Sequence, residues 1–221
     1  MSELNKKGKL IVIESLGDNY GKTTIANELK SRLENSSIYS FPSHLNPMGL
    51  FINEMLITGD INLLEMDQEF LSSIYLYDFK MVYDIYIKND LDRGKDVILD
   101  RYYFSTLVYQ TAINELQGKY DGEEFYKNMV NFIDKYLKLP RPDNIVVLVD
   151  THGASRDMDN KNDQFERNED LQNLVKIIGK KVTLDNNFNN LTYLDISDTH
   201  GKRKPLEYNV CKVLELIKLD Q

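Results

Sequence analysis

The sequence has few features typical of secreted or membrane proteins. Its 221 residues contain a single cysteine, Cys211, which excludes an internal disulfide and suits a reducing compartment. No stretch approaches the roughly 20 continuous apolar residues that a membrane-spanning helix needs. The apolar run at 9–15 is too short for a secretion signal and is better explained as a strand. We therefore expect a cytoplasmic protein that does not span a membrane.

Positive charge is also scarce. The chain has 27 basic and 35 acidic residues, which gives a net charge of −8. This balance argues against a broad surface for nucleic acid or for anionic lipid, although a local basic pocket could still hold a small anion. Internal repeats, low-complexity stretches and interdomain linkers are absent from the sequence, so we expect residues 1–221 to form a single domain.

Segments with strand and helix patterns alternate along the chain. Short strands rich in apolar and β-branched residues are predicted at 9–15, 37–41, 96–100, 143–150 and 191–197. Helices are predicted at 22–34, from about 47, at 66–91, from about 105, at 122–137, at 170–182 and from 205 onward. Such alternation predicts a three-layer α/β fold, in which a five-stranded parallel sheet is covered by helices on both faces.

The segment VIESLGDNYGKTTIANEL, at 12–29, contains half of a phosphate-binding loop. The usual spacing, G-x-x-x-x-G-K-S/T, requires glycine at position 16, where this chain has Leu16 followed by Gly17. Gly21, Lys22 and Thr23 nevertheless follow a buried strand and open a helix, the context in which backbone N–H groups and a helix N-terminus bind phosphate. We expect Gly17 to supply the missing backbone freedom. The alternative is a simple turn with an exposed lysine, whose loss would leave the fold intact.

A second candidate site lies in DVILDRYYFSTLVYQ, at 96–110. A buried strand ends there in Asp100, and Arg101 follows. Groups at the carboxyl ends of parallel strands line the ligand crevice of an α/β sheet. The acid can position magnesium and the arginine can grip a phosphate with two hydrogen bonds. The alternative is an Asp–Arg pair that only neutralises a loop.

Together these motifs resemble the thymidylate kinase family. The matching features occur in the family's order and cover almost the whole chain: IES…DNYGKTT, FPS at 41–43, DRYYFSTLVYQ, RPDNIVVLVD and DQFERNEDLQ. The resemblance implies a P-loop kinase that transfers the γ-phosphoryl group of MgATP to a deoxypyrimidine monophosphate, dTMP or dUMP. It also implies a lid at about 151–170 and a homodimer formed through helices, for which the aromatic-rich tract 71–87 offers apolar surface.

The resemblance also assigns residues to the two nucleotides. The expected ATP contacts are Gly17, Asn19, Tyr20, Gly21, Lys22, Thr23 and Thr24, with Thr23 and Asp100 around magnesium. The expected acceptor contacts are Asp18 at the sugar 3′-hydroxyl, Arg101 at the phosphate, and Pro42, His44, Tyr75, Phe79, Ser105, Tyr109 and Gln110 along the rest of the molecule.

Several positions depart from the family pattern. His44 stands where an arginine often reaches the acceptor phosphate, which makes that grip weaker and pH-dependent. Gln164 replaces the lid arginine, so the positive charge on the transferred phosphoryl group must come from elsewhere. Arg156 is our first candidate for it; Lys161 and Arg167 are the others.

Base recognition should differ as well, because Phe79 occupies the place of an arginine that donates to pyrimidine O4. Unless Lys80 or Gln110 takes over as donor, discrimination among pyrimidines should be loose. Three alternatives remain open: a kinase for another or modified deoxynucleotide, a non-catalytic nucleotide sensor, and a deoxynucleoside kinase that uses Glu14 as base.

Overall fold

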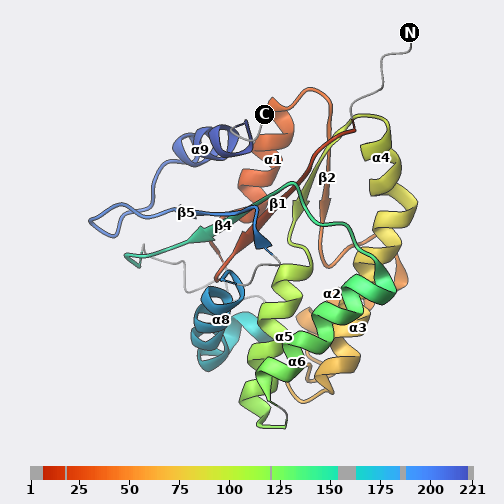
Figure 1. Cartoon of the computed structure of the whole chain (residues 1–221). Coiled ribbons are helices and arrows are strands. Elements are labelled where there is room, and N and C mark those ends of the chain that lie inside the picture. The colour runs from red at the N-terminus through yellow and green to blue at the C-terminus, as the bar shows by residue number, and fades with distance from the viewer. Residues whose placement is uncertain (1–6, 18, 120, 154–162, 185–187, 219–221) are drawn as a thin grey trace.

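A five-stranded parallel sheet forms the centre of the molecule (Figure 1). The structure is a computed structural model that describes residues 7–17, 19–119, 121–153, 163–184 and 188–218. The strand order is β2-β3-β1-β4-β5, as expected for the predicted fold class. The strands are β1 (Leu10–Ser15), β2 (Ser36–Ser40), β3 (Asp96–Asp100), β4 (Asn144–Val149) and β5 (Leu191–Asp195).

The central strand β1 is buried along its whole length, as its apolar sequence LIVIES predicts. It pairs with β3, where Ile13 lies opposite Asp100, and with β4, where Ser15 lies opposite Leu148. The carboxyl ends of β1 and β3 therefore meet at one edge of the sheet. That edge carries both motifs singled out in the sequence.

Helices cover both faces of the sheet (Figure 1). The residues of β1 alternate between two cores, with Ile11 and Ile13 in one and Leu10 and Val12 in the other. The first core is completed by α1 (Lys22–Arg32) and α9 (Leu206–Lys218). The larger core is built by α2 (Pro47–Thr58), α3 (Gln68–Val82), α5 (Tyr103–Gln117), α6 (Gly122–Asn131) and α8 (Glu169–Val182).

Most helix starts follow from their capping residues. Asn46 accepts hydrogen bonds from the N–H groups of Met48 and Gly49 at the start of α2, and Pro47 occupies the first turn. Asp67, Asp121 and Asn168 cap α3, α6 and α8 in the same way. The predicted tract 66–91 is one continuous helical region, since α3 passes through a π-helical turn, η1 (Tyr83–Ile87), into α4 (Lys88–Asp92). Another π-helical turn, η2 (Phe132–Leu137), extends α6.

Two local features were not predicted. The short helix α7 (Gln164–Arg167) lies just before α8. After β5 the chain forms a small hairpin, in which Ser197 and Arg203 pair as an isolated antiparallel bridge. Among the described residues, no helix is both long and apolar enough to cross a membrane.

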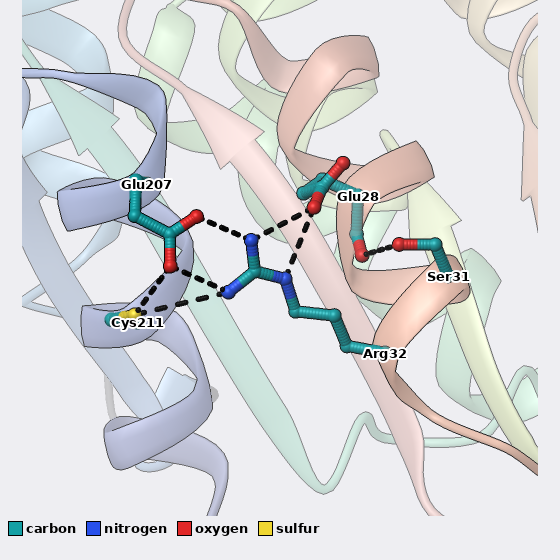
Figure 2. A network of polar contacts seen from close by, with 5 residues as sticks. All are labelled: Glu28, Ser31, Arg32, Glu207 and Cys211. Atoms are coloured by element: carbon teal, nitrogen blue, oxygen red, sulfur yellow. Dashed lines mark hydrogen bonds and ion pairs between the residues drawn. The ribbon is translucent and has the colours of Figure 1, made fainter.

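The first turn of α9 is fastened to the last turn of α1 by Arg32 (Figure 2). Its guanidinium donates to Glu28 on its own helix at 2.8 Å and to Glu207 on α9 at 3.0 Å, and Cys211 lies beside the same pair. Both carboxylates are solvent-accessible, so the pair orients α9 more than it stabilises the fold.

Candidate functional site

The loop between β1 and α1 wraps around the amino end of α1. Gly21, the N-cap, has φ 84°, and Asn19 has φ 61°, so the left-handed conformations lie at these two positions. Lys22 opens the helix and donates from Nζ to the Ser15 hydroxyl at 2.8 Å. The lysine is only 7% exposed, which argues against the alternative of a simple turn with an exposed lysine.

The irregular front of this loop has a packing explanation. Leu16 is buried against Gly179 of α8, where even one added methyl carbon would collide with it. Gly17 does not adopt a left-handed conformation; its missing side chain makes room for the ring of Tyr20. Tyr20 is itself a core residue beneath α1 and α9. The prediction that Gly17 supplies backbone freedom is therefore wrong, whereas the Tyr20 ring packs in the core, so its expected contact with ATP stays a prediction for its backbone N–H alone.

A cavity opens where the loop meets the end of β3. We call it the loop cavity; among its lining residues are Asn19, Gly21, Lys22, Thr23, Thr24, Asp100 and Arg101. Thr23 Oγ1 donates to Asp100 Oδ2 at 2.5 Å. The structure thus brings most of the predicted donor-side residues together in one place.

A second cavity lies between α3, α5 and α7. We call it the aromatic cavity; it is lined by Phe41, Pro42, Leu56, Tyr75, Phe79, Arg101, Ser105, Thr106, Tyr109, Gln110, Asp163 and Phe165. Tyr75 and Phe79 both face it, as their spacing of four residues on one helix predicts. All of the predicted acceptor residues within the described ranges line it, apart from His44.

Arg101 lines both cavities. It has φ 71°, a left-handed conformation that is uncommon for a residue with a side chain and is often found at ligand sites. Its backbone N–H donates to the Ile13 carbonyl at 3.1 Å, and its guanidinium lies 5.7 Å from the centre of the Tyr109 ring. The backbone that follows β3 therefore turns this cation toward the boundary between the cavities.

Behind this boundary lies Glu14, which is completely buried. Its carboxylate accepts hydrogen bonds from the N–H groups of Tyr102, at 2.8 Å, and Ser105, at 3.3 Å, and from the Ser105 hydroxyl. Glu14 lies on β1 and therefore caps α5 from a strand other than β3, which precedes that helix. Burial raises the pKa of its carboxyl to about 7, while the Ser105 hydroxyl and the Arg101 charge oppose that rise. Glu14 lines neither cavity, which argues against the alternative that it serves as base to a nucleoside.

The wall of the aromatic cavity contains a buried amide. Gln110 is 1% exposed, and its amide oxygen has no hydrogen-bond partner among the described residues. An unpaired buried polar group is costly unless a ligand or water satisfies it. Phe79, by contrast, is well packed. Its ring lies edge-on to the rings of Phe41 and Tyr102, with ring centres 4.5 Å and 5.3 Å apart. Lys80 bonds to Asp84 at 2.8 Å and does not line the cavity.

The turn after β2 holds a further correction. Pro42 lines both cavities, whereas His44 is exposed and lines neither, so the predicted histidine contact with the acceptor phosphate is not seen. Asp78 fixes the turn, since its buried carboxylate accepts from the Ser43 N–H at 2.7 Å and from the Asn46 amide at 2.6 Å.

The lid positions divide into two groups. Asp18, Arg156 and Lys161 lie outside the described residues, as does the part of the expected lid at 154–162. Gln164 is described, and its amide joins α7 to the α2–α3 connection through Met55, Ile61 and the N–H of Leu63. Gln164 is thus a structural link, and Arg167 is exposed and lines neither cavity.

Comparison with known proteins identifies the family. A family model described as thymidylate kinase matches residues 17–198. The chain belongs to the thymidylate kinase family. Members of this family are nucleoside-monophosphate kinases, so the two cavities belong to an enzyme that handles two nucleotides.

Individual members of the family support this assignment. A probable thymidylate kinase from Saccharolobus solfataricus is 32% identical over 184 residues, which cover 82% of this chain and 85% of that protein. A thymidylate kinase from Buchnera aphidicola is 36% identical over 110 residues, covering 48% of this chain and 51% of that protein. The solved thymidylate kinase of Candida albicans shares the fold, with a TM-score of 0.75 at 24% identity over 97% of this chain and 92% of that one.

Sequence reasoning missed several lining residues. Phe165 and Asp163 face the aromatic cavity from the DQFER segment, whose resemblance to the family was noted without assigning them roles. Arg203 and Glu166 line the loop cavity. Arg203 comes from the hairpin after β5, beyond the matched family region, so no motif pointed to it.

Proposed function

We propose that this protein transfers the γ-phosphoryl group of MgATP to dTMP, giving dTDP and ADP. The observation that carries this proposal is Arg101, which lines the loop cavity and the aromatic cavity at once. Phosphoryl transfer requires two phosphates held in line, with cations around the oxygens between them. A guanidinium at the boundary can contact both. The relatives named thymidylate kinase support dTMP as the acceptor.

The loop cavity is assigned to ATP. The amino end of α1 presents its first N–H groups there, and the helix dipole adds positive potential. Lys22 begins this helix with its ammonium group at the loop, where it can move from Ser15 to a β- or γ-phosphate oxygen. Asn19, Gly21 and Thr24 complete the wall around the phosphate chain.

Thr23 and Asp100 fit a magnesium ion. A hydroxyl and a carboxylate already side by side at 2.5 Å supply the oxygen ligands that Mg²⁺ prefers. Among the described residues, no cluster of three or more acidic, histidine or cysteine side chains could hold a metal by itself. This agrees with a site completed by phosphate oxygens and water. Bound there, magnesium would neutralise charge on the β- and γ-phosphates.

The aromatic cavity is assigned to the deoxynucleoside monophosphate. Tyr75, Phe79 and Phe165 give it apolar walls suited to a pyrimidine ring, and Gln110 supplies the buried amide that can read the base edge. Arg101 would hold the acceptor phosphate at the open end. Ser105 lines the cavity, but its hydroxyl is engaged with Glu14, so we assign it to holding α5 in place.

We further propose that the enzyme works as a cytoplasmic homodimer. The single cysteine supports a reducing compartment. Several apolar side chains on α3 and the segments beside it are exposed, including Tyr77 (45%), Ile85 (56%) and Tyr136 (71%). Such a face is typical of an association surface.

A coupled assay of ADP release tests the proposed reaction. The purified chain would be given MgATP with dTMP, dUMP, dCMP, dGMP, thymidine or deoxyuridine in turn. We expect the highest kcat/KM with dTMP. Turnover of a nucleoside would instead indicate a deoxynucleoside kinase. A chain that binds ATP but releases no ADP with any acceptor would be a nucleotide sensor.

A further inference from the structure

A cation reaches the loop cavity from outside the P-loop. Arg203 Nη2 donates to the Asn19 carbonyl at 2.7 Å. The same nitrogen lies 3.1 Å from the point where a side-chain carbon on Gly21 would stand. Arg203 therefore lies directly against the phosphate loop and lines the same cavity as Lys22.

Hydrogen bonds within the hairpin and to the end of β5 hold the segment that carries Arg203. Asp198 lies at its turn and accepts from the N–H groups of His200 and Lys202, both at 2.9 Å. Lys204 returns to the sheet through its N–H, which donates to Ile196 at 2.8 Å, and through Nζ, which donates to Asp195 at 2.9 Å. Because both ends of the hairpin are fixed to β5, the backbone of Arg203 is held in position before any ligand arrives.

The helix that follows the hairpin is fixed as well. Glu207, four residues after Arg203, is paired with Arg32 of α1 (Figure 2). The loop that contains Asn19 leads into the same helix α1. The segments that carry Arg203 and the phosphate loop thus continue into two helices, α9 and α1, that pack in the same core, which keeps the backbone of Arg203 near the loop while its side chain can still rotate.

The charge in the loop cavity leaves a role for this arginine. Asn19 and Tyr20 supply no charge, and Gln164 is committed to linking α7 with α2. Arg101 lies at the boundary with the aromatic cavity, which leaves Lys22 and Arg203 as the described cations on the donor side. Even with magnesium at Thr23 and Asp100, the triphosphate keeps negative charge close to Glu166, so a second cation beside Lys22 suits this cavity.

We propose that Arg203 binds the phosphate chain of the donor nucleotide, turning its guanidinium from the Asn19 carbonyl to the phosphate oxygens. This inference rests on the proposed function, in which the loop cavity holds ATP. Arginine suits the task because its planar donors can bind phosphate with two hydrogen bonds. The alternative is that Arg203 has only a structural role and links the hairpin to the phosphate loop.

Calorimetric binding of MgATP and of inorganic tripolyphosphate to Arg203→Ala separates these readings. A lost charge-assisted phosphate contact should weaken both ligands roughly ten- to hundredfold. Arg203→Lys should fall between wild type and Arg203→Ala. Lys202→Ala is the matched control, because it removes an exposed charge from the same hairpin and should bind as wild type does. dTMP affinity should not change in any variant.

The possible failures are distinguishable. Wild-type protein that binds no ATP would overturn the donor assignment and the proposed function with it. Wild-type binding that Arg203→Ala leaves unchanged would overturn only the role of Arg203. The same holds if the variant loses thermal stability alone, which would make Arg203 a structural fastener. Weakened ATP with unchanged tripolyphosphate would assign Arg203 to the adenosine portion and refute the phosphate contact.

Discussion

Lys22 donates to the hydroxyl of Ser15, the last residue of β1, at 2.8 Å. The same hydroxyl donates to the Gly17 carbonyl, so the strand, the loop and the first residue of α1 are joined through one serine. The loop lysine is therefore part of the local structure as well as the proposed phosphate ligand. This dual role changes what its replacement should do.

Lys22→Met should abolish measurable phosphoryl transfer, because no other described side chain can bring an ammonium group to this point of the loop. It should also lower the free energy of unfolding by about 1 kcal/mol, since the Ser15 hydroxyl loses a partner. Steady-state kinetics and urea denaturation check the two parts. Lys30→Met, on the same helix, is the control; near-native turnover in Lys22→Met would refute the site.

Arg101→Ala should raise the KM for dTMP and lower kcat together. A poorly held acceptor is also poorly aligned, and misalignment alone can cost on the order of 10²-fold. Arg101→Lys should recover only part of the loss, because an ammonium group cannot form the two parallel hydrogen bonds to one phosphate that the planar guanidinium forms. Arg167→Ala, on an exposed arginine that lines neither cavity, should behave as wild type. A variant with unchanged KM and kcat would remove Arg101 from the site.

Glu14 should make the stability of the protein depend on pH. Its pKa rises from 4.5 to about 7 on folding, because burial disfavours the charged carboxylate. The folded state therefore binds this proton more tightly than the unfolded state does. The resulting stabilisation is complete below about pH 4.5 and is lost as the pH rises through about 7. The full loss is on the order of 3 kcal/mol.

Glu14→Gln provides the measurement. This variant keeps an acceptor oxygen for the start of α5 but cannot ionise, so its free energy of unfolding should fall less than that of wild type between about pH 5 and pH 8. The exposed Glu34→Gln serves as control and should follow the wild-type curve. If wild type and Glu14→Gln run parallel across this range, the carboxyl does not titrate there.

The sequence predicted the sheet and the helical layers because their signals are local. The apolar run at β1 and the helical spacing in α3 need no distant partner to be recognised. The details of the phosphate loop were harder to predict, because they depend on how its side chains pack in three dimensions. Tyr20 enters the core because Gly17 leaves room for its ring, and Leu16 is in place because Gly179 of α8 has no side chain.

The candidate site divides in the same way. Lys22, Thr23, Asp100 and Arg101 belong to contiguous motifs, and the structure brings them to one cavity. Arg203 reaches that cavity only through a hairpin after the last strand, and no spacing in the sequence connects it to the loop. Motif reasoning thus finds groups on the strand ends and misses those that a distant segment delivers.

The proposed dimer should be visible as a mass of twice the 25.8 kDa chain in light scattering at micromolar concentration. Tyr77→Glu combined with Ile85→Glu should shift it toward the monomer, because charges on this exposed face oppose association. Leu184→Glu, on a residue that is 86% exposed elsewhere, is the control and should leave the mass unchanged. A wild-type mass equal to one chain would refute the prediction.

We expect selection of the base to depend on Gln110 rather than on Phe79. A Phe79→Arg exchange is a poor test, since Phe79 is 2% exposed between Phe41 and Tyr102 and a guanidinium there would be buried without a partner. An amide can pair with the N3–H and O4 of thymine or uracil. Rotated by half a turn, it can pair equally with the N3 and amino group of cytosine. A glutamine site therefore rejects cytosine less strongly than an arginine site does.

We accordingly expect the wild-type enzyme to phosphorylate dUMP within about tenfold of dTMP, because the two differ by one methyl group in an apolar cavity. Gln110→Leu, which keeps the size of the side chain, should reduce kcat/KM for dTMP, dUMP and dCMP by similar factors of roughly ten, since each loses hydrogen bonds to the same amide. Lys80→Ala should leave all three values unchanged, because Lys80 lies outside the cavity and is paired with Asp84. Measuring the three substrates on the three proteins decides the matter. A wild-type preference for dTMP over dUMP on the order of a thousandfold, or a Gln110→Leu enzyme with undiminished rates, would assign base recognition to another residue.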